Sequence, residues 1–317
     1  MTVDLAGSHL ANPVLTASGC AANGRELHRF FDVAGLGAVV TKTVMAAPRS
    51  GRGTPRMAET PSGMLNSIGL QGPGIRAFVQ EDLPWLASVG ARVVVSIAGG
   101  TAAEFAEVAA VLRDSAAFGP AVVAVEVNIS CPNVANRGLV FACDAGSSAE
   151  VVGLVREQLP AGVPVLAKLT PDVTDLVPIA AAAVGAGADG LTLVNTLLGL
   201  VIDTDRLRPQ LAGVTGGLSG PAIRPVAVRA IWQVTAAMRA GALPAVPVVG
   251  VGGVRTGRDA LELVAAGACA VQVGTATFGD PGAPARVRDE LTALVSGHGF
   301  TRFAEVVGIA HERVVAP

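Results

Sequence analysis

Several polar residues stand together where an apolar run ends, in the segment VEVNISCPNV at residues 125–134. Asn128, Ser130, Cys131 and Asn133 occupy positions where a buried strand favours Val and Ile. Amide side chains both donate and accept hydrogen bonds, which matches a planar ring that carries C=O and N–H groups. A thiol in the loop after a strand can act as a general base or a nucleophile. The segment predicts a ligand site with a reactive cysteine, and a small buried cysteine is the alternative interpretation.

Polar residues also stand at the ends of other apolar runs. They are Ser18, Lys42, Ser96, Asn128, Lys168 and Asn195, followed by Gly252 with Gly253 and by Gly274 with Thr275. Because a buried ammonium group is costly without an acceptor, Lys42 and Lys168 inside apolar runs indicate a bound partner. That partner would be a carboxylate or an electron-poor ring with carbonyl groups; a Schiff base is the alternative.

Eight short β-branched runs carry these residues. They cover residues 13–18, 37–43, 91–98, 122–129, 163–169, 189–196, 246–253 and 269–275. Ala-rich amphipathic segments, such as residues 102–112 and 148–159, lie between them. Apolar strands that alternate with helices indicate a parallel sheet covered on both faces. Eight such units predict a (β/α)8 barrel, and an open doubly wound sheet is the alternative.

In a barrel, the carboxyl ends of all strands converge on one face, which carries the active site. The glycines that end the last two runs let backbone N–H groups approach an anion closely, and the ends of strands 7 and 8 commonly bind phosphate. The pattern indicates a phosphate-bearing ligand, with plain turn glycines as the alternative. Two long connections, residues 44–73 and 197–220, are rich in Gly and Pro. Loops of this length are usually functional, so we expect one domain over residues 1–317 with both loops on the carboxyl-end face.

Composition excludes several other classes of protein. The chain has 317 residues and a formal net charge of −2, and it contains nine Phe, two Trp and no Tyr. The chain has neither the excess positive charge nor the many aromatic side chains that nucleic-acid-binding proteins use, so we do not expect it to bind nucleic acid. The four cysteines form no CxxC pair, and no His has zinc-ligand spacing, so no metal site is predicted. Scattered cysteines, no apolar run of about 18 residues and no leader-like start predict a cytoplasmic chain.

Seven ordered segments resemble one known family. They are NISCPNV (128–134), PSGMLNSIGLQGPG (61–74), VLAKLTPDVTD (165–175), ADGLTLVNTLLG (188–199), TGGLSGPAIRPVA (215–227), VGVGGV (249–254) and AVQVGTATF (270–278). Together they resemble dihydroorotate dehydrogenases, and within these the catalytic subunit of the NAD-linked, two-subunit class. The resemblance runs from about residue 2 to 300 and implies a barrel that binds FMN.

The resemblance also implies roles for individual residues. The positions that match FMN contacts are Ser18, Lys42, Thr43, Ser96, Asn128, Lys168, Val194, Gly220, Gly252, Gly253, Gly274 and Thr275; Ser96 stands where the family commonly has Asn. The positions assigned to the substrate are Lys42, Asn66, Ile68, Gly69, Leu70, Asn128, Asn133, Asn195 and Thr196. Cys131 matches the catalytic base, which would take a proton from C5 of dihydroorotate while a hydride leaves C6 for FMN.

The resemblance further implies a partner subunit with FAD and a [2Fe–2S] cluster that passes electrons to NAD, and a homodimer or heterotetramer. The loop RGLVFACDA departs from the family pattern and contains Cys143. Dihydropyrimidine dehydrogenases use a loop cysteine after a similar stretch, so an enzyme of that kind using Cys143 is one alternative function. A flavin-binding paralogue without turnover is a second alternative, and a phosphosugar isomerase or aldolase barrel is a third.

Overall fold

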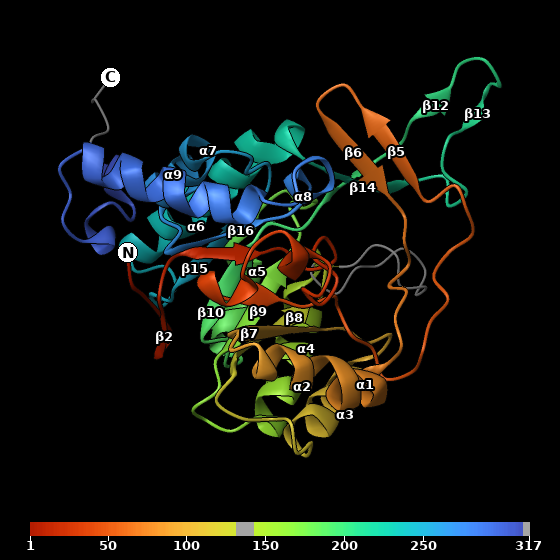
Figure 1. The fold of residues 1–317 in the computed structure, drawn as a ribbon, viewed down its shortest axis with the longest axis horizontal. Helices are drawn as coiled ribbons and strands as arrows, with labels where there is room; N and C mark the ends of the chain where they lie inside the picture. Colours follow the sequence, from red (N-terminus) through yellow and green to blue (C-terminus); the bar gives the residue numbers. More distant parts are fainter. Residues whose placement is uncertain (131–142, 313–317) are drawn as a thin grey trace.

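The computed structural model describes residues 1–130 and 143–312, and its centre is a barrel of eight parallel strands (Figure 1). The barrel strands are β3 (Val14–Thr16), β4 (Val39–Val40), β7 (Val93–Ile97), β8 (Val122–Asn128), β9 (Val165–Leu169), β10 (Gly190–Leu193), β15 (Val248–Val251) and β16 (Ala270–Val273). Their order is β3-β16-β15-β10-β9-β8-β7-β4. The Gly37 amide, just before β4, donates to the Val14 carbonyl of β3 at 2.8 Å, which joins the two strands at the ends of this order. The predicted (β/α)8 barrel is confirmed.

Helices follow the strands and pack around the barrel (Figure 1). They are α1 (Ile75–Ala77), the π-helix η3 (Phe78–Asp82), α2 (Leu83–Ser88), α3 (Ala102–Arg113), α4 (Ala145–Gln158), α5 (Val177–Gly185), α6 (Arg224–Arg239), α7 (Gly257–Ala266), α8 (Ala276–Gly279) and α9 (Ala283–Gly297). Short 3₁₀ helices are η1 (Leu27–Arg29), η2 (Val33–Gly35), η5 (Pro221–Ile223), η6 (Phe303–Glu305) and η7 (Ile309–Glu312). One continuous hydrophobic core joins the strands to these helices. The strands are buried because helices cover them, which explains their almost entirely apolar sequences.

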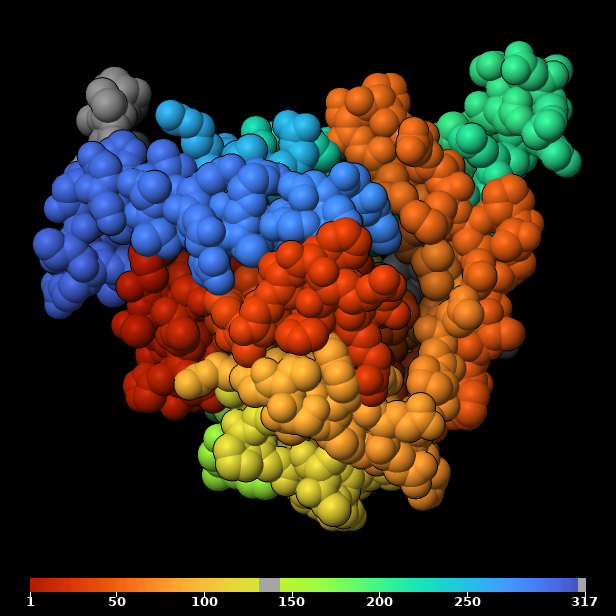
Figure 2. Space-filling model, in the orientation of Figure 1, coloured from red at the N-terminus to blue at the C-terminus, as the bar shows by residue number. Residues whose placement is uncertain are grey.

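The two long connections contain strands, and they pair with each other. The first holds the hairpin β5 (Met57–Thr60) and β6 (Gly63–Asn66); the second holds β11 (Leu197–Gly199), β12 (Ile202–Asp203), β13 (Arg208–Pro209) and β14 (Gly216–Ser219). β14 pairs antiparallel with β6, with Gly217 opposite Asn66, which gives a four-stranded sheet in the order β11-β14-β6-β5. We call this the inserted sheet. The β12–β13 hairpin extends from it as a separate lobe (Figure 2).

The remaining strands form a hairpin near the amino terminus, β1 (Val3–Leu5) with β2 (Ser8–Leu10). Over residues 1–130 and 143–312, none of the helices combines the length and apolar character that a membrane span requires. The expectation of one domain over residues 1–317 stays a prediction.

Candidate active site

Two adjoining cavities open where the barrel strands end. Both are lined by Ser18, Cys20, Asn195, Thr196 and Ser219, so these residues form a shared wall. Ser18 and Cys20 follow β3, whereas Asn195 and Thr196 follow β10 and Ser219 ends β14. Because the strands are parallel, their carboxyl ends bring these distant parts of the chain to one face of the barrel.

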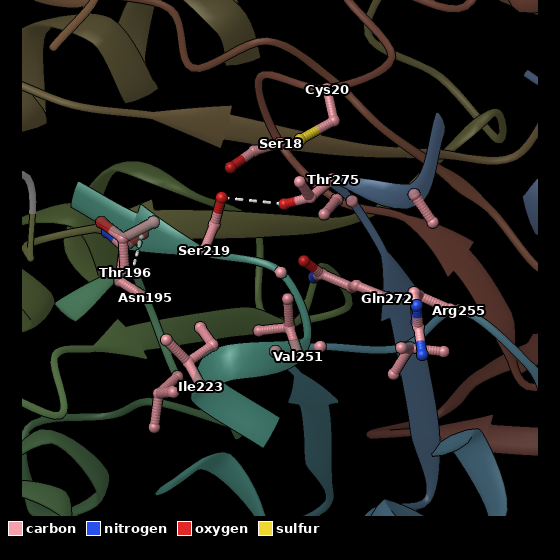
Figure 3. A pocket seen from close by; sticks show the side chains of 18 of the residues that line it. Ser18, Cys20, Asn195, Thr196, Ser219, Ile223, Val251, Arg255, Gln272 and Thr275 are labelled. Atoms are coloured by element: carbon pink, nitrogen blue, oxygen red, sulfur yellow. Dashed lines mark hydrogen bonds between the residues drawn. The ribbon is translucent and has the colours of Figure 1, made fainter. Parts of the chain in front are cut away.

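The first cavity, which we call the glycine-lined cavity, lies over the ends of β15 and β16. Its other lining residues are Ala17, Lys168, Val194, Gly220, Ile223, Val251, Gly252, Gly253, Val254, Arg255, Gln272, Gly274, Thr275 and Ala276. The amides of Gly253, Gly274 and Thr275 donate to no acceptor in the described part of the chain. The Thr275 hydroxyl donates to Ser219 Oγ at 2.8 Å across the cavity (Figure 3). Free amides that converge in this way form a binding site for an anion such as phosphate.

A buried polar network lies at the base of the glycine-lined cavity. Lys168 Nζ donates to Ser18 Oγ at 3.0 Å and to Glu126 Oε1 at 3.3 Å. Gln272 Nε2 donates to the other Glu126 oxygen at 2.7 Å, and the side chain points into the cavity (Figure 3). Gln272 Oε1 is buried with no partner among the described residues. Because buried polar atoms are normally hydrogen-bonded, this orphan acceptor fits a ligand that donates an N–H or O–H group.

The second cavity, which we call the amide-lined cavity, extends from the shared wall to the inserted sheet. Its other lining residues are Gly19, Lys42, Thr43, Met57, Met64, Asn66, Ile68, Gly69, Leu70, Asn128 and Phe278. The barrel contributes a cation and amide groups, whereas the inserted sheet contributes Met57, Met64 and Asn66. The cavity therefore has polar groups on its barrel side and apolar side chains opposite them, a combination typical of small-molecule sites.

Hydrogen bonds between side chains hold the amides in position. Asn195 Nδ2 donates to Ser130 Oγ at 2.7 Å and to Asn128 Oδ1 at 3.1 Å. Asn128 Nδ2 donates to Thr43 Oγ1 at 3.2 Å, and Thr43 Oγ1 lies 3.0 Å from Ser96 Oγ. Ser96 is fully buried behind Thr43 and is not among the residues that line the two cavities. Ser96 therefore supports a lining residue, which differs from the direct flavin contact that the sequence predicts.

Two hydrogen bonds fix the backbone of Lys42. Its amide N–H donates to the Ala22 carbonyl at 2.8 Å and to Asn23 Oδ1 at 3.2 Å. Asn23 in turn donates from Nδ2 to Asp82 Oδ2 at 2.7 Å. These hydrogen bonds fix the backbone from which the Lys42 side chain extends to the amide-lined cavity. The described residues that line this cavity include no Asp or Glu.

Cys20 lies in the shared wall with its sulfur close to both lysines. Burial raises the pKa of the Cys20 thiol to about 11, although the charges of Lys168 and Lys42 act in the opposite direction. The thiol is therefore neutral near pH 7 and is a poor candidate for a base. Cys269 packs elsewhere in the core, and burial raises the pKa of its thiol to about 12.

The structure brings most of the predicted site residues together. The glycine-lined cavity contains Ser18, Lys168, Val194, Gly220, Gly252, Gly253, Gly274 and Thr275, and the amide-lined cavity contains Ser18, Lys42, Thr43, Asn66, Ile68, Gly69, Leu70, Asn128, Asn195 and Thr196. Cys131 and Asn133 lie outside the described residues, and Ser130, which precedes Cys131 in the chain, contacts Asn195 as given above.

Cys143 lies away from both cavities. It is exposed, its sulfur is 4.0 Å from the Asp172 carbonyl, and it borders a separate open hollow with Val173 and Asp175. Among the described residues, no group of three His, Cys, Asp or Glu side chains is arranged to hold a metal ion.

Sequence reasoning missed Glu126, Gln272 and Ser219. Glu126 and Asn128 are two positions apart on β8, so both face the barrel interior, and Gln272 interrupts the apolar run of β16 in the same way as the lysines do in theirs. A polar residue at an inward-facing position of an apolar strand was the signal that could have identified Glu126 and Gln272. Ser219 could not be found in this way, because it reaches the cavity only through the inserted sheet.

This arrangement can hold a phosphate-bearing planar ligand in one cavity and a small anionic, amide-containing ligand in the next, side by side. Two cations, Lys42 and Lys168, stand near their junction. Such a geometry suits electron or hydride transfer between two adjacent rings.

Comparison with known proteins agrees with this geometry. The family model described as dihydroorotate dehydrogenase matches residues 1–295. A protein of Desulforudis audaxviator named dihydroorotate dehydrogenase B (NAD(+)), catalytic subunit, is 50% identical over 309 residues, which cover 98% of this chain and 97% of the relative. Proteins of the same name from Geobacter sp. strain M21 and Geobacter sulfurreducens are each 47% identical over 308 residues, which cover 97% of both chains. The chain belongs to the dihydroorotate dehydrogenase family.

Proposed function

We propose that this chain is an FMN-dependent dihydroorotate dehydrogenase, which oxidises dihydroorotate to orotate in pyrimidine synthesis. The observation that carries the proposal is the pair of adjoining cavities, one with free backbone amides and one with fixed side-chain amides, that share a wall. Substrate and cofactor must lie in contact for hydride transfer, and the shared wall gives them that contact. Family membership supports the same activity.

The glycine-lined cavity suits FMN. The amides of Gly253, Gly274 and Thr275 would hold the phosphate, because they have no other acceptor among the described residues. The ring would lie at the shared wall, where Lys168 and the unpartnered Gln272 oxygen supply a cation and an acceptor for its polar edge. When bound, FMN supplies the acceptor for the hydride that leaves C6 of the substrate.

The amide-lined cavity suits dihydroorotate. Asn66, Asn128 and Asn195 would pair with the C=O and N–H groups of the ring, and Lys42 would pair with the substrate carboxylate. The apolar side chains of Met64 and Leu70 would exclude water from the same space, which strengthens these polar contacts.

Cys131 is the base in this proposal. It follows Ser130, which is buried and hydrogen-bonded to Asn195, and its thiolate would take the proton from C5. The ordinary pKa of a free thiol, about 8.5 to 9, gives the base a useful thiolate fraction at neutral to alkaline pH. Among the described cysteines, Cys20 lines the cavities but has a pKa raised to about 11, and Cys143 lines neither of them.

The electrons leave through a second subunit in this proposal. The relatives are named catalytic subunits of an NAD(+) enzyme, which supports a partner. The GxGxxG match at residues 185–190 leads from a helix into a strand, the reverse of the order that a dinucleotide-binding fingerprint requires. We infer that the partner carries FAD and a [2Fe–2S] cluster, that the assembly is a homodimer or a heterotetramer, and that it is cytoplasmic. The purified chain alone should therefore reduce NAD far more slowly than its FMN is reduced by dihydroorotate.

The test compares two cysteine variants anaerobically. Dihydroorotate should bleach the flavin absorbance of the wild-type chain within seconds. Cys131→Ser should slow this bleaching by about 10²- to 10⁴-fold, because a weak hydroxyl base replaces the thiolate, while FMN stays bound. Cys143→Ser is the matched control and should bleach at close to the wild-type rate.

Equal losses in both variants would contradict the assignment of Cys131. Bleaching by dihydrouracil or dihydrothymine in place of dihydroorotate would contradict the substrate and support the dihydropyrimidine alternative. A chain that takes up no flavin would refute the cofactor.

A further inference from the structure

The carboxylate of Glu126 is buried in the barrel centre and has no part in the function derived above. The side chain of Glu126 is 0% exposed and that of its partner Lys168 is 4% exposed. One Glu126 oxygen accepts from Lys168 and the other from Gln272, so both oxygens are used within the network. Even with a paired cation, a charge removed from water in this way adds little net stability, so its presence calls for another reason.

Glu126 is the counter-charge to Lys168. The described residues that line the two cavities include Lys42, Lys168 and Arg255 but no Asp or Glu. Burial keeps the Cys20 thiol neutral by raising its pKa to about 11. In the described part of the chain, Glu126 is the acidic side chain within ion-pair distance of Lys168, and it lies behind the lysine, not on the cavity surface.

Lys168 stands at the end of the glycine-lined cavity that meets the substrate. Its Nζ contacts Ser18, a residue of the shared wall, so its cation lies beside the wall that the two cavities have in common. A ring that must reach the amide-lined cavity therefore has its polar edge beside Lys168. Reduction adds negative charge to that edge of a flavin, so the net charge beneath it affects the reduced form most.

We propose that Glu126 is a positioning residue that holds Lys168 against the bound flavin and offsets part of its charge, and thereby lowers the reduction potential of the FMN. This inference rests on the proposed function, because it requires FMN in the glycine-lined cavity. Glu126 touches neither cavity, so it acts through Lys168 and Gln272. Since the pair is buried, the effect of its charge is weakly screened by solvent.

The network tolerates an uncharged replacement. In Glu126→Gln, the new carbonyl oxygen can accept from Lys168, and the new amide nitrogen faces Gln272. Gln272 Oε1 has no partner among the described residues, so a rotation of the Gln272 amide lets it accept from this nitrogen. The substitution removes one negative charge and keeps the shape and the two hydrogen bonds within the network, whereas the rotated Gln272 turns its nitrogen in place of its oxygen toward the cavity.

The test is an anaerobic titration of the FMN-loaded chain against a reference redox dye, which gives the affinity for reduced FMN relative to oxidised FMN. Glu126→Gln should raise this ratio at least tenfold, which is about 30 mV for a two-electron couple. Glu157→Gln, the same change at an exposed position of α4, is the matched control and should leave the ratio unchanged. An unchanged or lowered ratio in Glu126→Gln would overturn the proposal.

A second comparison covers the case in which Glu126→Gln does not fold. Lys168→Gln alone leaves the Glu126 charge unpaired and should lower the ratio, whereas adding Glu126→Gln to it should return the ratio toward wild type. A double variant no different from Lys168→Gln would overturn the proposal. Failure of the proposed function is distinguishable, since the wild-type chain would then bind no FMN or would not be reduced by dihydroorotate.

Discussion

The two cavities share a wall, but different parts of the chain line the rest of each cavity. The glycine-lined cavity is made mainly from the ends of barrel strands, and the part proposed to bind phosphate consists of backbone amides. The amide-lined cavity takes six lining residues between Met57 and Leu70 from the inserted sheet and the chain that follows it. In the proposed function, the barrel would therefore hold the cofactor, whereas the inserted sheet would complete the substrate site. Substitutions should separate the two binding events.

The largest effect is expected at the backbone of the glycine-lined cavity. Gly253 has φ +76°, and an added Cβ would lie 2.6 Å from Arg224 Cβ and 3.0 Å from the Arg224 backbone. Gly253→Ala should therefore displace the loop and weaken FMN binding about a hundredfold, since overpacking costs roughly 1–3 kcal/mol and strain at positive φ adds to it. Fluorescence titration of the apo chain with FMN measures the change.

Gly90→Ala is the matched control for backbone strain. Gly90 has a similar φ of +75°, but an added Cβ would meet nothing within 4 Å. It should lose stability from the backbone strain and keep its FMN affinity. Equal FMN affinities in the two variants would show that the close approach to Arg224 does not matter.

A smaller effect is expected on the substrate side. Asn66 lines the amide-lined cavity from β6, and its Nδ2 donates to the Gly217 carbonyl at 3.4 Å. Asn66→Ala should weaken dihydroorotate binding about tenfold, the loss expected for one buried hydrogen bond, with FMN affinity unchanged within about twofold. Leu198→Ala, at a 54% exposed position of the same sheet, should change neither. Parallel losses of FMN and substrate in Asn66→Ala would refute the division between the cavities.

The smallest effect concerns the wall that the cavities share. The pKa of Cys20 is raised from its ordinary value of 9.0 to about 11, so the unfolded chain loses this proton first as the pH rises. The stabilisation is therefore complete below pH 9 and is lost as the pH rises toward about 11. In urea unfolding at a series of pH values, Cys20→Ala should lose less stability than wild type over this window. Identical slopes would show that the folded thiol titrates normally.

The barrel and most of the lining residues could be predicted from sequence. The barrel strands are mainly apolar runs, and near the ends of four of them a Lys or Asn marks the face where the cavities open, as Lys168 does on β9. The family prediction from seven motifs is confirmed. Glu126 was missed because its run was read as apolar packing. Strand position also does not reveal that Ser96 lies against Thr43, and its contact with flavin stays a prediction.

The inserted sheet could not be predicted in the same way. Its pairing joins Asn66 to Gly217, and no local pattern specifies a partner so distant along the chain. The connections were read as irregular loops, although TPSG between alternating residues is a hairpin signal. The roles of Cys131 and Asn133 stay predictions.

The pairing of β6 with β14 has a consequence for the order of events during synthesis. Domains acquire structure as the chain leaves the ribosome, from the amino terminus onward. The β5–β6 hairpin emerges early but has no neighbour until Gly216–Ser219 has been made, by which time six of the eight barrel strands exist. A nascent or truncated chain that stops before β14 exposes an unpaired strand edge, a template for misassociation. The proposed substrate site is thus completed late in synthesis. Until then, the β5–β6 hairpin that lines it is also the part of the nascent chain most exposed to misassociation.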